Sequence, residues 1–387
     1  NVYFPRLVSA LDIPSVQLDG DRANSIALIK NNGNFDILKN MVDSLESEGA
    51  ILDNPAFKFF IDRICADENC APEMVVEALS DSGEEVESAE VELDAGQILK
   101  DEWAVLTAQF PNTSNFKKID VITPIEGGQD GAELRNGFGL IDRLSLITKI
   151  REVRALSGFE RFKTTGDHVV STKLQANLWM PALEVYGEGI FFSLDEAELG
   201  AWEQQHAQFL PPRISAAVES WANNSLGSFL PKPNGRFILL HTLAHLLMRQ
   251  IVFECGYSSS SLRERIYSSE EGDPAMAGIL IYTADSDSEG ALGGLVDQGR
   301  ENTFMNNVIN ALAGAEWCSN DPICSEIEGQ GLAGLNRAAC HACALTAETS
   351  CVYGNALLDR TLLLGTRDEN SDFKGYFEEI LNQIRTK

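Results

Sequence analysis

Apolar residues recur at helical spacing in several segments, which account for much of the predicted structure. This spacing predicts helices over residues 35–45, 57–64, 144–162, 237–253 and 302–316. The C-terminal tail carries one apolar stripe at the same spacing, formed by Phe373, Tyr376, Phe377, Ile380, Leu381 and Ile384. We expect this stripe to pack on the body of the protein, with a partner surface as the alternative.

Other apolar runs lack helical spacing and predict strands. Residues 2–5 are strand-like, and residues 278–283 form the continuous apolar run of a buried strand. Ser261 and Glu264 have the spacing of a capping box, which predicts that a helix opens there. Together these segments indicate a mixed α/β (α+β) fold class.

Five of the eight cysteines gather near the C-terminus, on loops rich in Asn, Asp, Gly and Pro. They are Cys318, Cys324, Cys340, Cys343 and Cys351. A tight Cys-x-x-Cys turn with two further thiolates is the layout of a structural zinc site, and a closed four-cysteine site leaves no position for substrate water. One thiol is surplus. The spacing favours Cys324, Cys340, Cys343 and Cys351, with Cys318 as the competing fourth ligand. Buried reduced thiols are the alternative interpretation.

Composition divides the chain further. Between Arg63 and Lys100 there is no basic residue, and acidic residues crowd this stretch. Its run Ser80-Asp-Ser-Gly-Glu-Glu predicts a mobile insertion that like charges keep extended. Prolines at 211, 212, 231 and 233 precede the C-terminal region. The predicted organisation is multidomain: an N-terminal segment with the insertion (1–100), a middle α/β domain (101–235), a zinc-binding domain (236–365) and an amphipathic helix (366–387).

The net charge of -28 is unfavourable for a protein that binds nucleic acid by itself. It suits docking on a more basic partner, although solubility alone also explains it. One basic concentration stands out, comprising Lys149, Arg151, Arg154, Arg161 and Lys163. These residues either meet phosphates or neutralise acidic segments of the same molecule, and the second interpretation is favoured.

His241 and His245 lie one turn apart on the predicted helix 237–253, with Arg249 a turn further on. Zinc proteases need a Glu after the first histidine, where this chain has Thr242, so a metallopeptidase is disfavoured. Structural, hydrogen-bonded histidines or an anion-facing stripe with Arg249 remain. The run from Asp285 to Glu289 resembles half of a calcium loop without its closing Glu, and predicts a strand-to-helix turn; a weak cation site is the alternative.

No recognisable catalytic set emerges, so we expect a protein that is not an enzyme. The sequence has no Gly-x-x-x-x-Gly-Lys-Ser/Thr loop, and Gly187-Glu-Gly189 lacks the third glycine of a dinucleotide fingerprint. Cys65 and Cys70 lack further ligands nearby and are expected to be ordinary thiols. The longest apolar stretch, 237–248, is too short to span a membrane. Clustered rather than dispersed cysteines suggest a reducing cytoplasm.

Several motifs resemble one family. They are Asn1-Val-Tyr-Phe-Pro-Arg-Leu, Arg151-Glu-Val-Arg-Ala-Leu, Gly187-Glu-Gly-Ile-Phe-Phe, His241-Thr-Leu-Ala-His-Leu-Leu, Gly278-Ile-Leu-Ile-Tyr-Thr, Ser288-Glu-Gly-Ala-Leu-Gly-Gly, Ala339-Cys-His-Ala-Cys and Leu358-Asp-Arg. The chain thereby resembles the DrmB family, accessory subunits of the DISARM anti-phage defence system. Its C-terminal part is similar to the MrfA-type zinc-binding domain.

The resemblance implies a non-motor partner of a helicase-like subunit (DrmA-like), in a complex that binds foreign DNA. It implies zinc at Cys340, Cys343 and Cys351 with Cys318 or Cys324, and a further N-terminal portion ahead of Asn1. With so acidic a chain, DNA contact is expected mainly through the partner. Two other functions stay open. One is a metal-dependent hydrolase (nuclease or peptidase) that uses His241, His245 and the Asp285 to Glu289 turn, and the other is an acidic DNA mimic.

Overall fold

The computed structural model describes most of the chain. The described residues are 3–12, 29–30, 32–43, 54–68, 70, 72–80, 95–108, 116–119, 140–161, 169–171, 180–223, 230–269, 275–283, 294–367 and 371–385. The chain divides into two compact units, one formed by residues 1–14 with 95–387 and the other by residues 15–94.

The smaller unit is helical. Its helices are α2 (Phe35–Asp43), α3 (Pro55–Glu68) and α4 (Pro72–Ser80). Side chains such as Phe35, Leu38, Ile61 and Val75 form its core, so the two helices predicted here are confirmed. Helix α4 ends at Ser80, where the predicted mobile insertion begins, and residues 81–94 lie outside the described residues. Cys65 and Cys70 are half-buried and form no disulfide bond within the described part of the chain.

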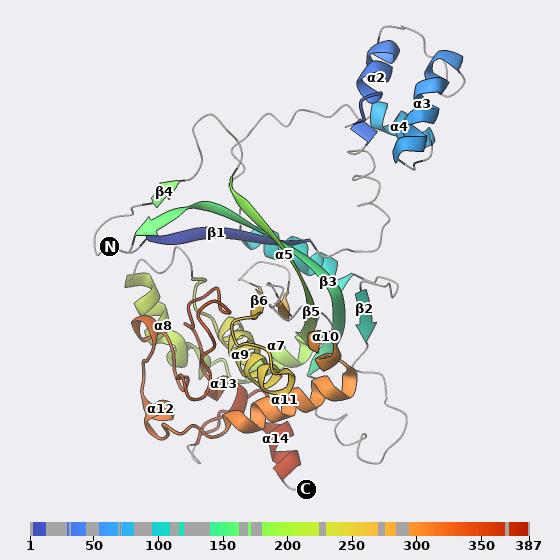
Figure 1. The fold of residues 1–387 in the computed structure, drawn as a ribbon. Helices are drawn as coiled ribbons and strands as arrows, with labels where there is room; N and C mark the ends of the chain where they lie inside the picture. Colours follow the sequence, from blue (N-terminus) through green and yellow to red (C-terminus); the bar gives the residue numbers. More distant parts are fainter. Residues whose placement is uncertain are drawn as a thin grey trace. The chain divides into compact units, whose positions relative to one another are not determined.

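The larger unit is built on a seven-stranded sheet in which every described pairing is antiparallel. Its strands are β1 (Tyr3–Asp12), β2 (Phe116–Ile119), β3 (Ile141–Arg161), β4 (Val169–Ser171), β5 (Ala182–Leu194), β6 (Leu262–Ser268) and β7 (Ala277–Thr283). The order is β1-β3-β5-β7-β6, and β2 and β4 also pair with β3. The long strand β3 thus pairs with β1, β2, β4 and β5, more partners than any other described strand has (Figure 1).

The helix predicted over residues 144–162 is wrong, because this segment is strand β3. Its apolar side chains lie on both faces of the sheet. Leu144 and Leu146 enter one core, whereas Ile147 and Ile150 enter the other. A register shift against β5 between Ile147 and Ile150 places residues three apart on one face, and this bulge imitates helical spacing.

Both faces of the central strands are buried. Phe192 and Ile281 belong to the main core on one face, whereas Phe191 and Leu280 belong to a smaller core on the other. All seven residues of β7 are buried, which explains the continuous apolar run that predicted this strand correctly. Helix α5 (Ala95–Thr107) covers the smaller core with Leu99 and Trp103.

Helix α9 (Gly235–Cys255) covers the other face of the sheet and contacts β6, β7 and α11 (Figure 1). Asn234 caps its start by accepting from the Phe237 N–H, and Gly256 ends it at a φ of 71°. Among the described helices it is the one long and apolar enough to cross a membrane by length and composition. However, 72% of its apolar window is buried inside the protein, as expected of a core helix.

The remaining described helices all belong to the larger unit. They are α7 (Glu196–Gln205), α8 (Leu210–Asn223), α10 (Gly294–Gln298), α11 (Glu301–Ala315), α12 (Ile323–Glu326), the 3-10 turn η3 (Leu332–Gly334), α13 (Thr361–Leu364) and α14 (Glu378–Arg385). The helices predicted over 237–253 and 302–316 are thus confirmed as α9 and α11. The helix predicted from the capping box at Ser261 is wrong, because Leu262 begins strand β6. Leu262 and Ile266 of this strand enter the main core, whereas Tyr267 enters the smaller core on the other face.

The four-part division expected from the sequence differs from the observed packing. One main core includes residues from the predicted middle domain, the zinc-binding domain and the tail, for example Phe192, Leu243 and Phe377. Most of the tail stripe packs there as expected, although the helix itself begins only at Glu378. The side chain of Ile384 lies outside the described part.

Candidate metal centre

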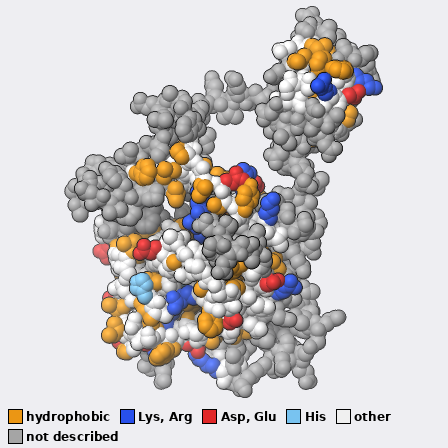
Figure 2. Space-filling model, viewed as in Figure 1, with side chains coloured by type: hydrophobic (Ala, Val, Ile, Leu, Met, Phe, Trp, Pro, Cys, Tyr) orange, Lys and Arg blue, Asp and Glu red, His pale blue; other side chains and the backbone are white. Residues whose placement is uncertain are grey.

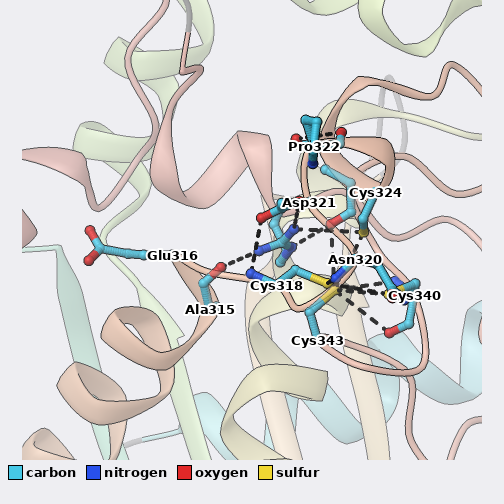
Figure 3. A network of polar contacts seen from close by, with 12 residues as sticks. Ala315, Glu316, Cys318, Asn320, Asp321, Pro322, Cys324, Cys340 and Cys343 are labelled. Carbon is cyan, nitrogen blue, oxygen red and sulfur yellow. Dashed lines mark hydrogen bonds and ion pairs between the residues drawn. The ribbon is translucent and has the colours of Figure 1, made fainter.

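Four cysteines from three short segments converge at the edge of the main core (Figure 3). Cys318 follows the end of α11, and Cys324 lies in α12. Cys340 and Cys343 stand at either end of a tight turn, which is closed by the Cys343 N–H donating to the Cys340 carbonyl at 3.1 Å. Because each segment is held by its own backbone hydrogen bonds, the four thiols are presented together.

The separations of the sulfur atoms fit a tetrahedral metal ion. All four Sγ atoms lie within 4.8 Å of one another. Cys318 Sγ is 3.5 Å from Cys340 Sγ, while Cys343 Sγ is 3.8 Å from both Cys340 Sγ and Cys324 Sγ. Four sulfurs at about 2.3 Å from one zinc ion are about 3.8 Å apart, so the observed spacing suits zinc.

Backbone and amide N–H groups surround the sulfurs. The Asn320 N–H donates to Cys318 Sγ at 3.4 Å, and the Cys340 N–H donates to Cys343 Sγ at 3.3 Å. The Asn320 side-chain amide also donates to Cys340 Sγ at 3.4 Å. Such donors favour thiolates over thiols and orient them, as the outer groups of metal sites do.

One buried cation, Arg360, lies beside the four cysteines. Its guanidinium donates to the carbonyls of Ala315 and Ala338, and its Nη2 lies 3.7 Å from Cys324 Sγ. Asp321 accepts from it at 3.5 Å and, at its other oxygen, from Arg367 at 2.7 Å. A zinc ion with four thiolates has a net negative charge. Because the site is shielded from water, the guanidinium is the group that offsets this charge.

The thiols differ in acidity before any metal binds. Burial opposes ionisation of Cys340, but hydrogen bonds from Asn320, the Ala342 backbone and Cys318 outweigh it and lower its pKa to about 6. Burial raises the pKa of Cys324 to about 11 and raises that of Cys343 further. Cys340 is therefore better prepared than Cys324 or Cys343 to bind a metal ion as a thiolate, and the ion would then deprotonate those two.

The ligand set favoured from the sequence needs one exchange, because the structure places Cys318, not Cys351, with the other three cysteines. Cys351 lies on a different loop, where the neighbouring Ser350 hydroxyl donates to the Ser259 carbonyl at 2.6 Å. Its sulfur is 3.3 Å from His241 Nε2, within a second group formed with His245 and Glu264. Sequence reasoning assigned Glu264 to a helix cap and gave Arg360 no role of its own, so it missed that both lie in or beside these clusters.

The histidine pair is buried, with 0% exposure at both His241 and His245. Neither imidazole reaches solvent, so the described residues leave no opening at this histidine pair where substrate and water could meet. Arg249 does not continue an anion-facing stripe, because its guanidinium donates to the carbonyls of Ala342 and Leu345. The turn from Asp285 to Glu289 lies outside the described residues.

The basic residues on β3 pair mainly within the chain. Arg151 forms ion pairs with Glu184 at 2.8 Å and Asp12 at 3.2 Å, and Arg154 pairs with the buried Glu152 at 2.8 Å. Lys149 Nζ lies 5.7 Å from the centre of the Tyr186 ring. The side chains of Arg161 and Lys163 lie outside the described part. On the face drawn in Figure 2, the described basic side chains are scattered among acidic and apolar ones.

The fold and the cysteine site define the class: a mixed α+β chain with a C-terminal zinc-binding domain. Residues 243–344 match the family model of the MrfA Zn-binding domain, and this range contains all four clustered cysteines. The chain is similar along nearly its whole length to the DISARM protein DrmB of Bacillus paralicheniformis, with 32% identity over 391 residues. The match covers 98% of this chain and 65% of that relative, and the resemblance to DrmB proteins is thereby confirmed.

Proposed function

We propose that this chain is a zinc-stabilised, non-motor subunit of an anti-phage defence complex, in which a helicase-like partner translocates on DNA. The observation that carries the proposal is the similarity to DISARM protein DrmB over 98% of the chain. The chain spans 65% of that relative's length, and the proposed role covers the part that matches.

The chemistry of the metal centre supports a structural rather than catalytic role. Cys318, Cys324, Cys340 and Cys343 supply four ligands, which completes a tetrahedron and leaves no position for a substrate. Zinc bound there stabilises the loops that follow α11, because the unfolded chain does not present the thiolates together. The sequence also lacks a phosphate-cradling loop, so the proposal assigns ATP hydrolysis to the partner.

The charge distribution supports a division of labour on DNA. The net charge is -28, and the basic side chains of Arg151 and Arg154 are engaged by carboxylates of this chain. A protein gains affinity for DNA from Lys and Arg side chains that bind phosphates and release the counterions of the DNA. We therefore assign most of the DNA contact to the partner, and to this chain a scaffolding and regulatory role.

Co-expression with the helicase-like subunit tests the proposal. We expect the two proteins to co-purify in a fixed ratio, with ATP hydrolysis in the complex and none by this chain alone. Cys340→Ser should lose zinc and weaken both complex formation and protection in a phage plating assay. Cys255→Ser is the matched control, because Cys255 is half-buried and belongs to neither group of metal-ligating residues. Protection that persists without this chain, or ATP turnover by it alone, would refute the proposed role.

A further inference from the structure

Four metal-ligating side chains meet in the core beneath α9, apart from the cysteine site described above. His241 and His245 come from α9, Glu264 from β6, and Cys351 from the loop after the Cys340–Cys343 turn. Their donor atoms all lie within 4.8 Å of one another. The exposures are 0% for the histidines and Glu264 and 4% for Cys351, so this is a closed site.

The hydrogen bond of His245 fixes which of its nitrogens carries the proton. Its Nδ1 is 3.0 Å from the Ala344 carbonyl oxygen, which only accepts, so Nδ1 must donate. In a neutral imidazole, Nε2 then presents a lone pair, and it does so toward Glu264 Oε1 at 3.3 Å. Two lone pairs facing each other in a dry interior repel. A cation between them removes the conflict, and an Nδ1–H bound to a carbonyl is the usual arrangement of metal-ligating histidines.

The other donors converge on the same point. His241 Nε2 lies 3.0 Å from Glu264 Oε1 and 3.3 Å from Cys351 Sγ. The second oxygen of Glu264, Oε2, is buried and has no hydrogen-bond partner among the described residues. A buried carboxylate oxygen without a hydrogen bond lowers the stability of the fold unless another group binds it. A metal ion is such a group.

We propose that His241, His245, Glu264 and Cys351 form a second structural zinc site. Around one tetrahedral zinc ion, nitrogen, oxygen and sulfur ligands at their usual bond lengths are about 3.3–3.6 Å apart, close to the observed 3.0–3.3 Å. The charges also balance. A divalent ion with one thiolate, one carboxylate and two neutral imidazoles has no net charge, as a fully buried site requires.

This site is distinct from the zinc site of the matched domain. The family match covers residues 243–344 and therefore excludes His241 and Cys351. The four ligands are also of mixed chemistry, whereas the first site uses sulfur alone. Because all four positions are filled by the protein and no ligand is exposed, the second ion would join α9, β6 and the Cys351 loop rather than act on a substrate.

Zinc X-ray absorption and metal analysis of the purified full chain test this proposal without any mutation. Two zinc ions per chain are expected, with an average first shell of about 2.5 sulfur and about 1.5 nitrogen or oxygen ligands, from four sulfurs at one site and one at the other. One zinc ion per chain with four sulfur ligands would overturn the second site and leave the first intact. One zinc ion in a shell rich in nitrogen and oxygen would instead overturn the first.

Two variants locate the ions. Glu264→Gln keeps the shape of the side chain but removes its charge, and it should lower the zinc content from two to one while the remaining shell becomes all sulfur. Cys324→Ser should remove the sulfur-only signal and leave the mixed shell. Cys255→Ser should retain both ions. If Glu264→Gln keeps two zinc ions and an unchanged spectrum, the four residues form a hydrogen-bonded cluster instead.

Discussion

Replacing Arg360 tests whether the buried guanidinium supports the cysteine site. Arg360→Met keeps most of the apolar length of the side chain and removes the cation and its donors. Two backbone carbonyls, those of Ala315 and Ala338, lose a donor, and the charge beside Cys324 Sγ disappears. Asp321 keeps its second ion pair, with Arg367.

The magnitude follows from these contacts. Each buried carbonyl left without a donor costs about 1–3 kcal/mol, so the two together cost about 2–6 kcal/mol. Removing one partner of a buried charge network costs about 3–5 kcal/mol. Both figures describe the loss of the same guanidinium and are not additive, so we expect Arg360→Met to lower the free energy of unfolding by about 3–5 kcal/mol and to speed zinc release.

Urea unfolding followed alongside zinc release to a coloured chelator measures both effects. Arg367→Met is the matched control, because Arg367 also contacts Asp321 but its side chain is 54% exposed, so we expect a loss below about 1 kcal/mol. Arg360→Lys, which keeps the charge but not the planar fork, should fall between the two. Equal stability and equal zinc release in Arg360→Met and wild type would refute this reasoning.

Three further outcomes are expected from the larger unit. Gly187→Ala should destabilise the sheet strongly, because its added Cβ would lie 1.7 Å from the Thr283 carbonyl oxygen. The Cβ of Gly200→Ala on α7 would meet no atom within 4 Å, so this control should be neutral or stabilising in thermal unfolding. Glu102→Ala should cost about 3–5 kcal/mol in urea, because Arg265, whose side chain is 13% exposed, loses its carboxylate partner. Asp101→Ala, on the exposed side of the same helix, should cost under about 0.5 kcal/mol, and equal losses would contradict the burial argument. Burial lowers the pKa of His206 despite the opposing charge of Glu378, so the unfolded state binds the proton more readily, and stability should fall as pH drops from about 7.5 to about 5.5. His206→Gln should reduce that slope in pH-dependent melting, and an unchanged slope would assign it to other groups.

The chemistry of the metal centre could be predicted from residue types, whereas the ligand assignment could not. Five cysteines at short spacing indicated zinc, and four of them do gather. Cys351 lies nearer to Cys343 in the sequence than Cys318 does, but its loop carries it beneath α9. Spacing alone does not record which way a loop turns, so the choice between these two cysteines required the fold.

Strand β3 shows the corresponding limit for secondary structure. Helix α9 was predictable because its apolar run is long and capped at both ends, by Asn234 and Gly256. In β3, a register shift between Ile147 and Ile150 changed the period of the apolar side chains from two to three. The pair Gly187 and Gly189 looked like a failed nucleotide motif, yet the Cβ positions show that close packing against β7 and β3 requires glycine there.

The two groups of metal-ligating residues differ in the length of chain that they close, which has a consequence for the order of folding. The four cysteines are at most 25 positions apart in the sequence (Cys318 to Cys343), so this loop can close before the sheet has formed. The contact between His241 and Cys351 spans 110 residues and joins segments on either side of β6, β7 and α11. Closing this longer loop costs more conformational entropy, so we expect this contact to form later. A nascent chain would therefore assemble its sulfur-rich loops first and complete the core beneath α9 last.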